Sequence, residues 1–274
     1  MNSRFFKSLI TITLFVTASQ LLSAQAEDKF DFERIEDNSF LLEEAYNQEA
    51  GVIQHISSFQ YMNDKTWAYS FTDEWPVTGQ RHQLSASLIL LGNDNTGLGD
   101  VALNYRYQAI LRERFAFSPR FSLLLPTGNY KKGLGNGVVG FQTNMPVSYI
   151  WTHWLVTHYN LGLTYTPSAR DALSNKSDIT TVNYGASAIF LISPTFNFMV
   201  ELAGNSGFTK PESSEVVRNN SLFINPGIRY AINFKSGLQI VPGIAFPVGL
   251  GSSSGDYGIF GYLSFEHPLR ILKQ

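Results

Sequence analysis

The sequence contains no cysteine among its 274 residues, and charged residues make up only 15% of it. The absence of cysteine excludes a disulfide-held fold and is compatible with an exported protein that needs no disulfides. Long hydrophobic runs are also absent. The apolar run at residues 9–18 is too short to span a bilayer as a helix, and no later segment approaches the roughly eighteen apolar residues that such a helix needs. Any residence in a membrane would therefore require a β-barrel.

The first residues have the features of a secretory signal peptide. Arg4 and Lys7 precede the apolar run, and the small residues Ala24-Gln25-Ala26 follow it, which predicts a leader of residues 1–26 that is cleaved near Ala26. The next segment, residues 27–50, holds nine acids and two bases. The formal net charge of the whole chain is only −2, which gives no indication of nucleic-acid binding.

What the sequence has in abundance is aromatic residues, with 21 Phe, 13 Tyr and 4 Trp, set in segments of alternating polarity. The clearest segment is residues 101–111, where Val101, Leu103 and Tyr105 fall on one face while Asn104 and Arg106 fall on the other. This period of two predicts a strand with one apolar and one polar face. The same pattern recurs to Phe265, and short turns alternate with longer loops.

This pattern predicts an all-β fold, a transmembrane up-and-down antiparallel β-barrel of about twelve strands over residues 51–266, with a C-terminal tail at 267–274. The first strand is expected near residues 51–61. Lipid would contact the apolar face, and the lumen would hold the polar face. The alternative is a soluble lipocalin-like or sandwich protein, in which the apolar face would point inward. Aromatic residues near many strand ends favour the outer membrane of a Gram-negative bacterium.

The stretch FSPRFSLLLPTGNYKKGLGNGVVGFQTNMPVSYIW, from Phe117 to Trp151 and preceded by GLGDVALNYRYQ, resembles the outer-membrane family named for the putative meta-pathway of phenol degradation. The recognisable points are a Gly-x-Gly-Asp strand opening and a Pro-Thr-Gly strand exit, and the resemblance covers roughly residues 84–265. It implies a transporter of aromatic or small apolar compounds. It implies no catalytic residues.

Two arginines are expected to face each other in the lumen. If Leu111 lies opposite Phe115, Arg106 lies opposite Arg120, and two facing guanidinium groups require an anion between them. Arg229 is also placed inside the barrel. The candidate anions are a solute, the inward-facing Glu201, and three acids of the N-terminal segment, Glu43, Glu44 and Glu49.

The hypothesis that follows is a plug, in which the acidic segment enters the barrel, with residues 39–49 forming a short helix that ends at Gly51. The alternative is a static network of charges within the lumen. The remaining inward positions are rich in amides, which favour water and polar solutes over apolar ones. These lining residues are Asn104, Gln142, Asn144, Asn160, Asn183, Asn197 and Asn225.

Prolines inside the strands offer a different route for an apolar compound. Pro119 and Pro146 fall near the same depth of neighbouring strands, as do Pro226 and Pro242, and each removes a backbone donor. They would mark either a lateral opening or simple bends that fit the curvature of the barrel.

An enzyme is a further alternative, because Ser148 and His158 are expected to lie opposite each other, as in a nucleophilic pair. No acid has an evident place as the third member and no glycine elbow surrounds the serine, so a plain cross-strand hydrogen bond is the competing interpretation. The histidines and loop aspartates lack the spacing of metal ligands, so no metal and no cofactor are expected.

The sequence thus predicts a monomeric outer-membrane channel or transporter for small molecules. Its expected partners are outer-membrane lipid, lipopolysaccharide, a small-molecule solute and, during insertion, the barrel-assembly machinery. A structural or adhesive barrel without an open pore is the second hypothesis, and an outer-membrane lipid hydrolase is the third.

Overall fold

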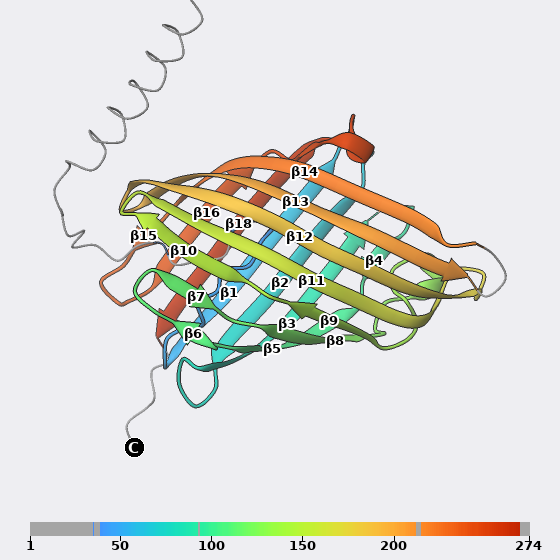
Figure 1. Cartoon of the computed structure of the whole chain (residues 1–274), viewed down its shortest axis with the longest axis horizontal. Coiled ribbons are helices and arrows are strands. Elements are labelled where there is room, and N and C mark those ends of the chain that lie inside the picture. The colour runs from blue at the N-terminus through green and yellow to red at the C-terminus, as the bar shows by residue number, and fades with distance from the viewer. Residues whose placement is uncertain (1–34, 36–38, 93, 212–214, 269–274) are drawn as a thin grey trace, which may run out of the picture. The chain divides into compact units, whose positions relative to one another are not determined.

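The computed structural model describes residues 35, 39–92, 94–211 and 215–268. In these residues one antiparallel β-sheet closes on itself, because β1 pairs with β2 on one side and with β18 on the other. Figure 1 shows the strands winding around this barrel at a steep tilt. The eighteen β segments of the described chain form twelve wall strands, since several strands are interrupted once or twice. The predicted fold is therefore confirmed, including the strand number.

The first six wall strands contain ten β segments. These are β1 (Val52–Met62), β2 (Trp67–Pro76), β3 (His82–Gly92), β4 (Thr96–Leu98) with β5 (Val101–Tyr107) and β6 (Ile110–Leu111), β7 (Phe115–Phe117) with β8 (Arg120–Leu125), and β9 (Gly140–Asn144) with β10 (Val147–Thr152).

The other six wall strands contain the remaining segments, and two short 3₁₀ helices lie in the loops. These are β11 (Leu155–Arg170), β12 (Lys176–Ser193), β13 (Phe196–Pro211), β14 (Val217–Tyr230) with β15 (Ile232–Asn233), β16 (Gln239–Ala245) with β17 (Val248–Gly249), β18 (Gly258–Pro268), η1 (Tyr130–Lys132) and η2 (Gly251–Ser253). Among the described residues, no helix is long and apolar enough to cross a membrane.

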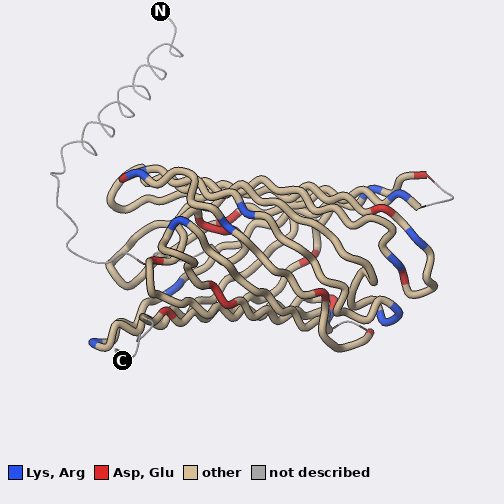
Figure 2. Tube along the Cα trace, turned by 90° about the horizontal axis from the view of Figure 1, so that it is seen from below, with Lys and Arg blue, Asp and Glu red and all other residues tan. Residues whose placement is uncertain are grey.

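The alternation of side chains gives the wall two faces. On β5, Leu103 and Tyr105 are exposed by 46% and 41% on the outer face, whereas Asn104 and Arg106 are buried in the lumen. Figure 2 shows Lys, Arg, Asp and Glu near the ends of the barrel and at a few places along it, with long uncharged stretches between. An apolar outer face and a polar inner face are what a barrel in lipid requires.

The two ends of the barrel differ in their connections. Residues 112–114, 153–154 and 194–195 form tight turns at the end where β1 begins and β18 finishes. Residues 126–139 and 250–257 connect strands at the opposite end, beyond which β12 to β14 project (Figure 1). Short turns face the periplasm in barrels of this kind, so the first end is called the periplasmic end and the second the outer end.

Pro119 and Pro146 lie at interruptions of wall strands, whereas Pro226 and Pro242 lie within β14 and β16, and the backbone pairing continues past all four. Pro119 separates β7 from β8 and Pro146 separates β9 from β10, yet the carbonyl of Pro119 accepts from Tyr107 N–H at 3.0 Å and that of Pro146 accepts from Ser118 N–H at 3.2 Å. These bonds favour the interpretation of the prolines as bends over that of a lateral opening.

Two details of the predicted wall need correction. The turn places Leu111 opposite Ala116 rather than Phe115, and the one-residue slip is removed where the strand is interrupted at Gln108 and Ala109. Arg106 still lies opposite Arg120, as predicted. The last strand also extends to Pro268, two residues into the predicted tail, because its end pairs with Val52 and Ile53. The signal peptide and the tail beyond residue 268 lie outside the described residues.

Candidate functional site

The described part of the N-terminal segment lies inside the barrel. Residues 39–50, called here the inner segment, run along the lumen and join β1 at the periplasmic end. Ile35 packs near that end against Ala231 and Val241 of the wall. The Ser39 hydroxyl donates to that of Ser187 at 2.9 Å. The inner segment therefore enters and leaves at the periplasmic end, and residues 41–43 are its deepest part.

Side chains of the wall bind the backbone of the inner segment at almost every second residue. The N–H groups of residues 41, 43, 45, 47 and 48 each donate to a different wall side chain at 2.7–3.0 Å. Their acceptors, in that order, are Glu201, Asn160, Ser148, Gln108 and Gln83.

Residues 39–49 form neither helix nor strand, and the chain bends at residues 40–42 and 45. The predicted helix over residues 39–49 is therefore wrong. A helix would need those N–H groups for its own hydrogen bonds, but side chains of five different wall strands accept from them instead.

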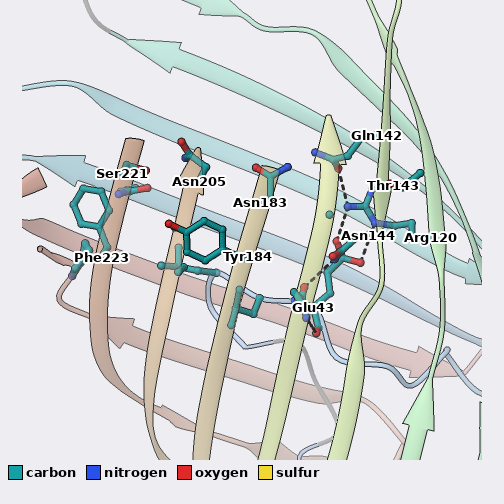
Figure 3. A pocket seen from close by; sticks show the side chains of 18 residues that line it. Glu43, Arg120, Gln142, Thr143, Asn144, Asn183, Tyr184, Asn205, Ser221 and Phe223 are labelled. Carbon is teal, nitrogen blue, oxygen red and sulfur yellow. Dashed lines mark hydrogen bonds and ion pairs between the residues drawn. The ribbon is translucent and has the colours of Figure 1, made fainter. Parts of the chain in front are cut away.

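Glu43 and Arg120 form an ion pair at the deepest part of the inner segment (Figure 3). The Arg120 guanidinium donates through Nε to Glu43 Oε2 at 2.9 Å, and its NH2 lies 2.6 Å from Glu43 Oε1. The same guanidinium donates to Asn104 at 2.9 Å and to Gln142 at 2.8 Å. Burial raises the pKa of Glu43, but the charges of Arg120 and Arg106 outweigh this and hold that pKa below its usual value.

Arg106 binds the inner segment mainly through backbone oxygens. It donates to the carbonyls of Glu44 at 3.2 Å and Tyr46 at 2.6 Å, and to Asn47 Oδ1 at 2.9 Å. Its carboxylate neighbour is Glu74 of β2, at 3.6 Å. Each arginine of the facing pair thus has its own acid. Glu44 is buried, whereas Glu49 is exposed and contributes a backbone carbonyl to Val52 N–H at 3.1 Å.

Glu201 belongs to a second cluster, on β13 and β14, and not to the arginine pair. Its carboxylate accepts from Leu41 N–H at 2.9 Å and from the Asn225 amide at 2.8 Å. Arg229 pairs with Asn197 in the strand register and donates to the Ile35 carbonyl at 3.5 Å. This cluster binds the backbone of Ile35 and Leu41, and Arg120 binds the side chain of Glu43.

Two apolar side chains of the inner segment fit over glycines of the wall. The Phe40 ring packs at 5.7 Å from that of Phe260 and 5.5 Å from that of Tyr262. A Cβ atom on Gly227 or Gly243 would come within 2.5 or 2.6 Å of the same ring. Leu42 stands in the same relation to Gly185, at 2.5 Å. Because the glycines have no side chains, they leave space in the lumen, and Phe40 and Leu42 of the inner segment fill that space by close packing.

Two adjoining cavities lie on the outer side of the inner segment. Their volumes are about 400 and 590 Å³, and both are bounded by Leu41, Leu42, Glu43 and Arg120. Figure 3 shows the smaller one, with Asn183, Asn205 and Ser221 along one side. The amides also bond to one another and to hydroxyls: Asn144 to Asn160, Asn104 to Ser85, and both Gln142 and Asn183 to Thr164.

Ser148 and His158 lie opposite each other as predicted, with Ser148 Oγ 2.7 Å from His158 Nδ1. The serine hydroxyl also accepts the Ala45 N–H at 2.8 Å, and both side chains are buried beneath the inner segment. Because its hydroxyl is occupied on both sides and a substrate would have to displace the inner segment to reach it, the pair acts here as a clamp on the backbone of Ala45.

The two recognisable motifs of the sequence bind each other at the outer end. Asp100 accepts from the N–H groups of Gly128 at 3.0 Å and Asn136 at 2.8 Å. Thr127 Oγ1 donates to the Gly99 carbonyl at 2.9 Å. The conformation of residues 126–139 therefore depends on an aspartate that precedes β5.

Several residues that bind the inner segment, or that bind its partners Arg106 and Gln83, were not predicted as such from the sequence. Glu74 and Gln83 hydrogen bond to each other at 2.7 Å, and Ser118 and Gln108 both donate to the Ala45 carbonyl. Gln108 and Ser118 have the inward parity of Arg106 and Arg120, so the alternation alone predicts them as lumen residues. The chain segment that they bind could not be found in that way.

A closed barrel with an apolar outer face and a polar lumen defines the class, which is that of the transmembrane β-barrels. The chain belongs to the family described as "Putative MetA-pathway of phenol degradation", whose match covers residues 36–248.

The fold is similar to that of an outer membrane channel from Pseudomonas putida F1, with 10% identity, a TM-score of 0.60, and coverage of 85% of this chain and 99% of that one. It is also similar to the NanC porin, with 9% identity, a TM-score of 0.54, and coverage of 78% of this chain and 100% of that one. No curated protein sequence matches the chain.

Proposed function

We propose that this protein is an outer-membrane channel for small molecules, closed on its periplasmic side by its own inner segment. The observation that carries the proposal is the row of five backbone N–H groups, each bound by a different lumen side chain. Such bonds hold the chain in a defined path and can be replaced by water when the chain leaves. If only the side chains of the wall filled the lumen, no chain segment could leave it and be replaced by water.

The solute we propose is a small organic compound. The family description refers to phenol degradation, and the solved relative from Pseudomonas putida F1 is named as an outer membrane channel. The smaller cavity is lined both by the apolar side chains of Leu41, Leu42 and Phe223 and by the amide side chains of asparagines and Gln142. A compound with one apolar and one polar part would find partners for both. The proposal includes export by a signal peptide, insertion by the barrel-assembly machinery, and a monomer that contacts lipopolysaccharide.

The experiment is a measurement of single-channel conductance in planar bilayers, with the mature chain compared to a variant lacking residues 39–49. We expect a larger conductance in the deletion variant, because the lumen loses the chain that occupies its periplasmic half. Glu49→Gln is the matched control, since that side chain is exposed and its loss should leave conductance unchanged. Heat-dependent mobility in gels verifies that each barrel has folded. An equal conductance in the folded deletion variant would refute the proposal.

A further inference from the structure

The ion pair at the deepest part of the inner segment has the form of a binding site for a carboxylate. Arg120 presents two nitrogens to the two oxygens of Glu43, at 2.9 and 2.6 Å. This fork matches a planar carboxylate in both spacing and charge. Asn104 and Gln142 accept from the remaining donors of the guanidinium and fix its plane. The barrel wall therefore holds Arg120 in a geometry that binds a carboxylate, and the carboxylate bound there is that of Glu43 from the inner segment.

This occupant is exchangeable, since Glu43 belongs to the inner segment and Arg120 belongs to the barrel wall. The Glu43 side chain is 27% exposed and that of Arg120 is 13% exposed, both toward the cavities of about 400 and 590 Å³. Because both cavities border Arg120 on the outer side of the inner segment, a solute that enters them from the outer end meets Arg120 without first passing the inner segment. The same guanidinium is thus available to a solute and to Glu43, but not fully to both at once.

The surroundings of this receptor suit an organic anion more than an inorganic one. Leu41, Leu42 and Phe223 border the smaller cavity together with the amides of Asn144 and Asn183. An inorganic anion would leave the apolar part of this cavity in contact with water alone. A carboxylate with an apolar body would contact it and release that water.

We propose that Arg120 is the binding residue for a small organic carboxylate, which competes with Glu43 and thereby loosens the deepest part of the inner segment. This inference rests on the proposed channel function and names its solute class. A ligand shifts an equilibrium only by its difference in affinity for the two states. Here the carboxylate binds better to the state in which Glu43 has left Arg120, so its binding favours release of the inner segment.

The test is equilibrium dialysis of radiolabelled benzoate against the mature chain in detergent micelles near neutral pH, with protein-free micelles as the background. Benzamide, which has nearly the same shape but no charge, is the matched ligand. We expect Glu43→Gln to bind benzoate on the order of tenfold more tightly than the unmodified chain, because a charge-assisted competitor has been removed. Arg120→Gln should bind it on the order of tenfold more weakly.

Two further variants keep the outcome clear. Arg120→Lys retains the charge but not the fork, and should bind benzoate less tightly than the unmodified chain even if Arg120→Gln fails to fold. Asp64→Asn removes an exposed acid from the turn after β1, outside the cavities, and should bind like the unmodified chain.

Equal affinity of Glu43→Gln and the unmodified chain would overturn the inference, as would benzamide or inorganic phosphate binding as tightly as benzoate. These measurements need no conductance. If the benzoate affinities contradict the inference but the variant lacking residues 39–49 conducts more than the mature chain, the proposed channel still stands. If that variant shows no increase in conductance, the proposed channel is refuted but the carboxylate site is not.

Discussion

Phe40 is expected to be the strongest single anchor of the inner segment. Its ring is 7% exposed, contacts Phe260 and Tyr262, and fills the space over Gly227 and Gly243. Replacement of a buried phenylalanine by alanine costs about 3–5 kcal/mol when the surroundings do not collapse. Gly227 and Gly243 have no side chains that could move in to fill the space. The low end of that range corresponds to a population of the released state that is about 100-fold larger.

The absence of cysteine from the chain gives a direct assay for release. Ser39 is 2% exposed, so a thiol introduced by Ser39→Cys should react with a membrane-impermeant maleimide only when the inner segment has left its site. When opening and reclosing are fast relative to labelling, the rate follows the released population. We expect Phe40→Ala to raise the labelling rate of the Ser39→Cys chain about 100-fold.

The control is Phe59→Ala, which removes the same ring from a position 43% exposed on the outer face of β1. It should leave the labelling rate of Ser39→Cys unchanged. Since the loss of the Ser39 hydrogen bond is common to both chains, it cancels in the comparison. Equal labelling rates with and without Phe40 would show that the ring does not hold the inner segment, and would refute the packing argument.

Two further predictions concern charge. The lowered pKa of Glu43 means that its ion pair with Arg120 contributes fully above the usual value of 4.5 and is lost as pH falls through the lower value in the folded protein, so conductance should rise at acidic pH. Glu43→Gln should lack this acid response; an identical pH profile in that variant would contradict the assignment. Asp100→Asn weakens the acceptor of the Gly128 and Asn136 N–H groups, at a cost of about 1–3 kcal/mol, and should speed tryptic cleavage within residues 126–139 on the order of tenfold. Asp64→Asn, which removes a carboxylate acceptor of a backbone N–H from the turn after β1, is the control, and unchanged cleavage in the Asp100 variant would rule out the role given to that carboxylate.

Local alternation determined the wall of this barrel. In a strand the side chains point to opposite faces, so the assignment of Leu103 and Tyr105 to lipid and of Asn104 and Arg106 to the lumen needed no knowledge of distant residues. Turn lengths then placed Arg106 opposite Arg120 and Ser148 opposite His158. The error in the partner of Leu111 was also local, because the one-residue shift in register is removed where the strand is interrupted at Gln108 and Ala109.

Only the tertiary structure decided what the lumen residues bind. Glu43, Glu44 and Glu49 are equivalent by composition, yet Glu43 alone of the three meets Arg120 among the described contacts, because the path of the inner segment sets its depth. That path depends on residues far along the chain, such as Asn160 and Glu201, which bind it, and Gly227, which leaves space for it.

The non-helical form of the inner segment also results from contacts with distant residues. Its acidic and apolar residues are compatible with a helix, and the sequence offered no local signal against one. The acceptors that take the place of helical hydrogen bonds come from five different wall strands between β3 and β13, and they are brought together only in the folded barrel. The alternation of polar and apolar residues specifies the strands of the barrel. The path of the inner segment within the barrel depends instead on contacts with residues from many strands.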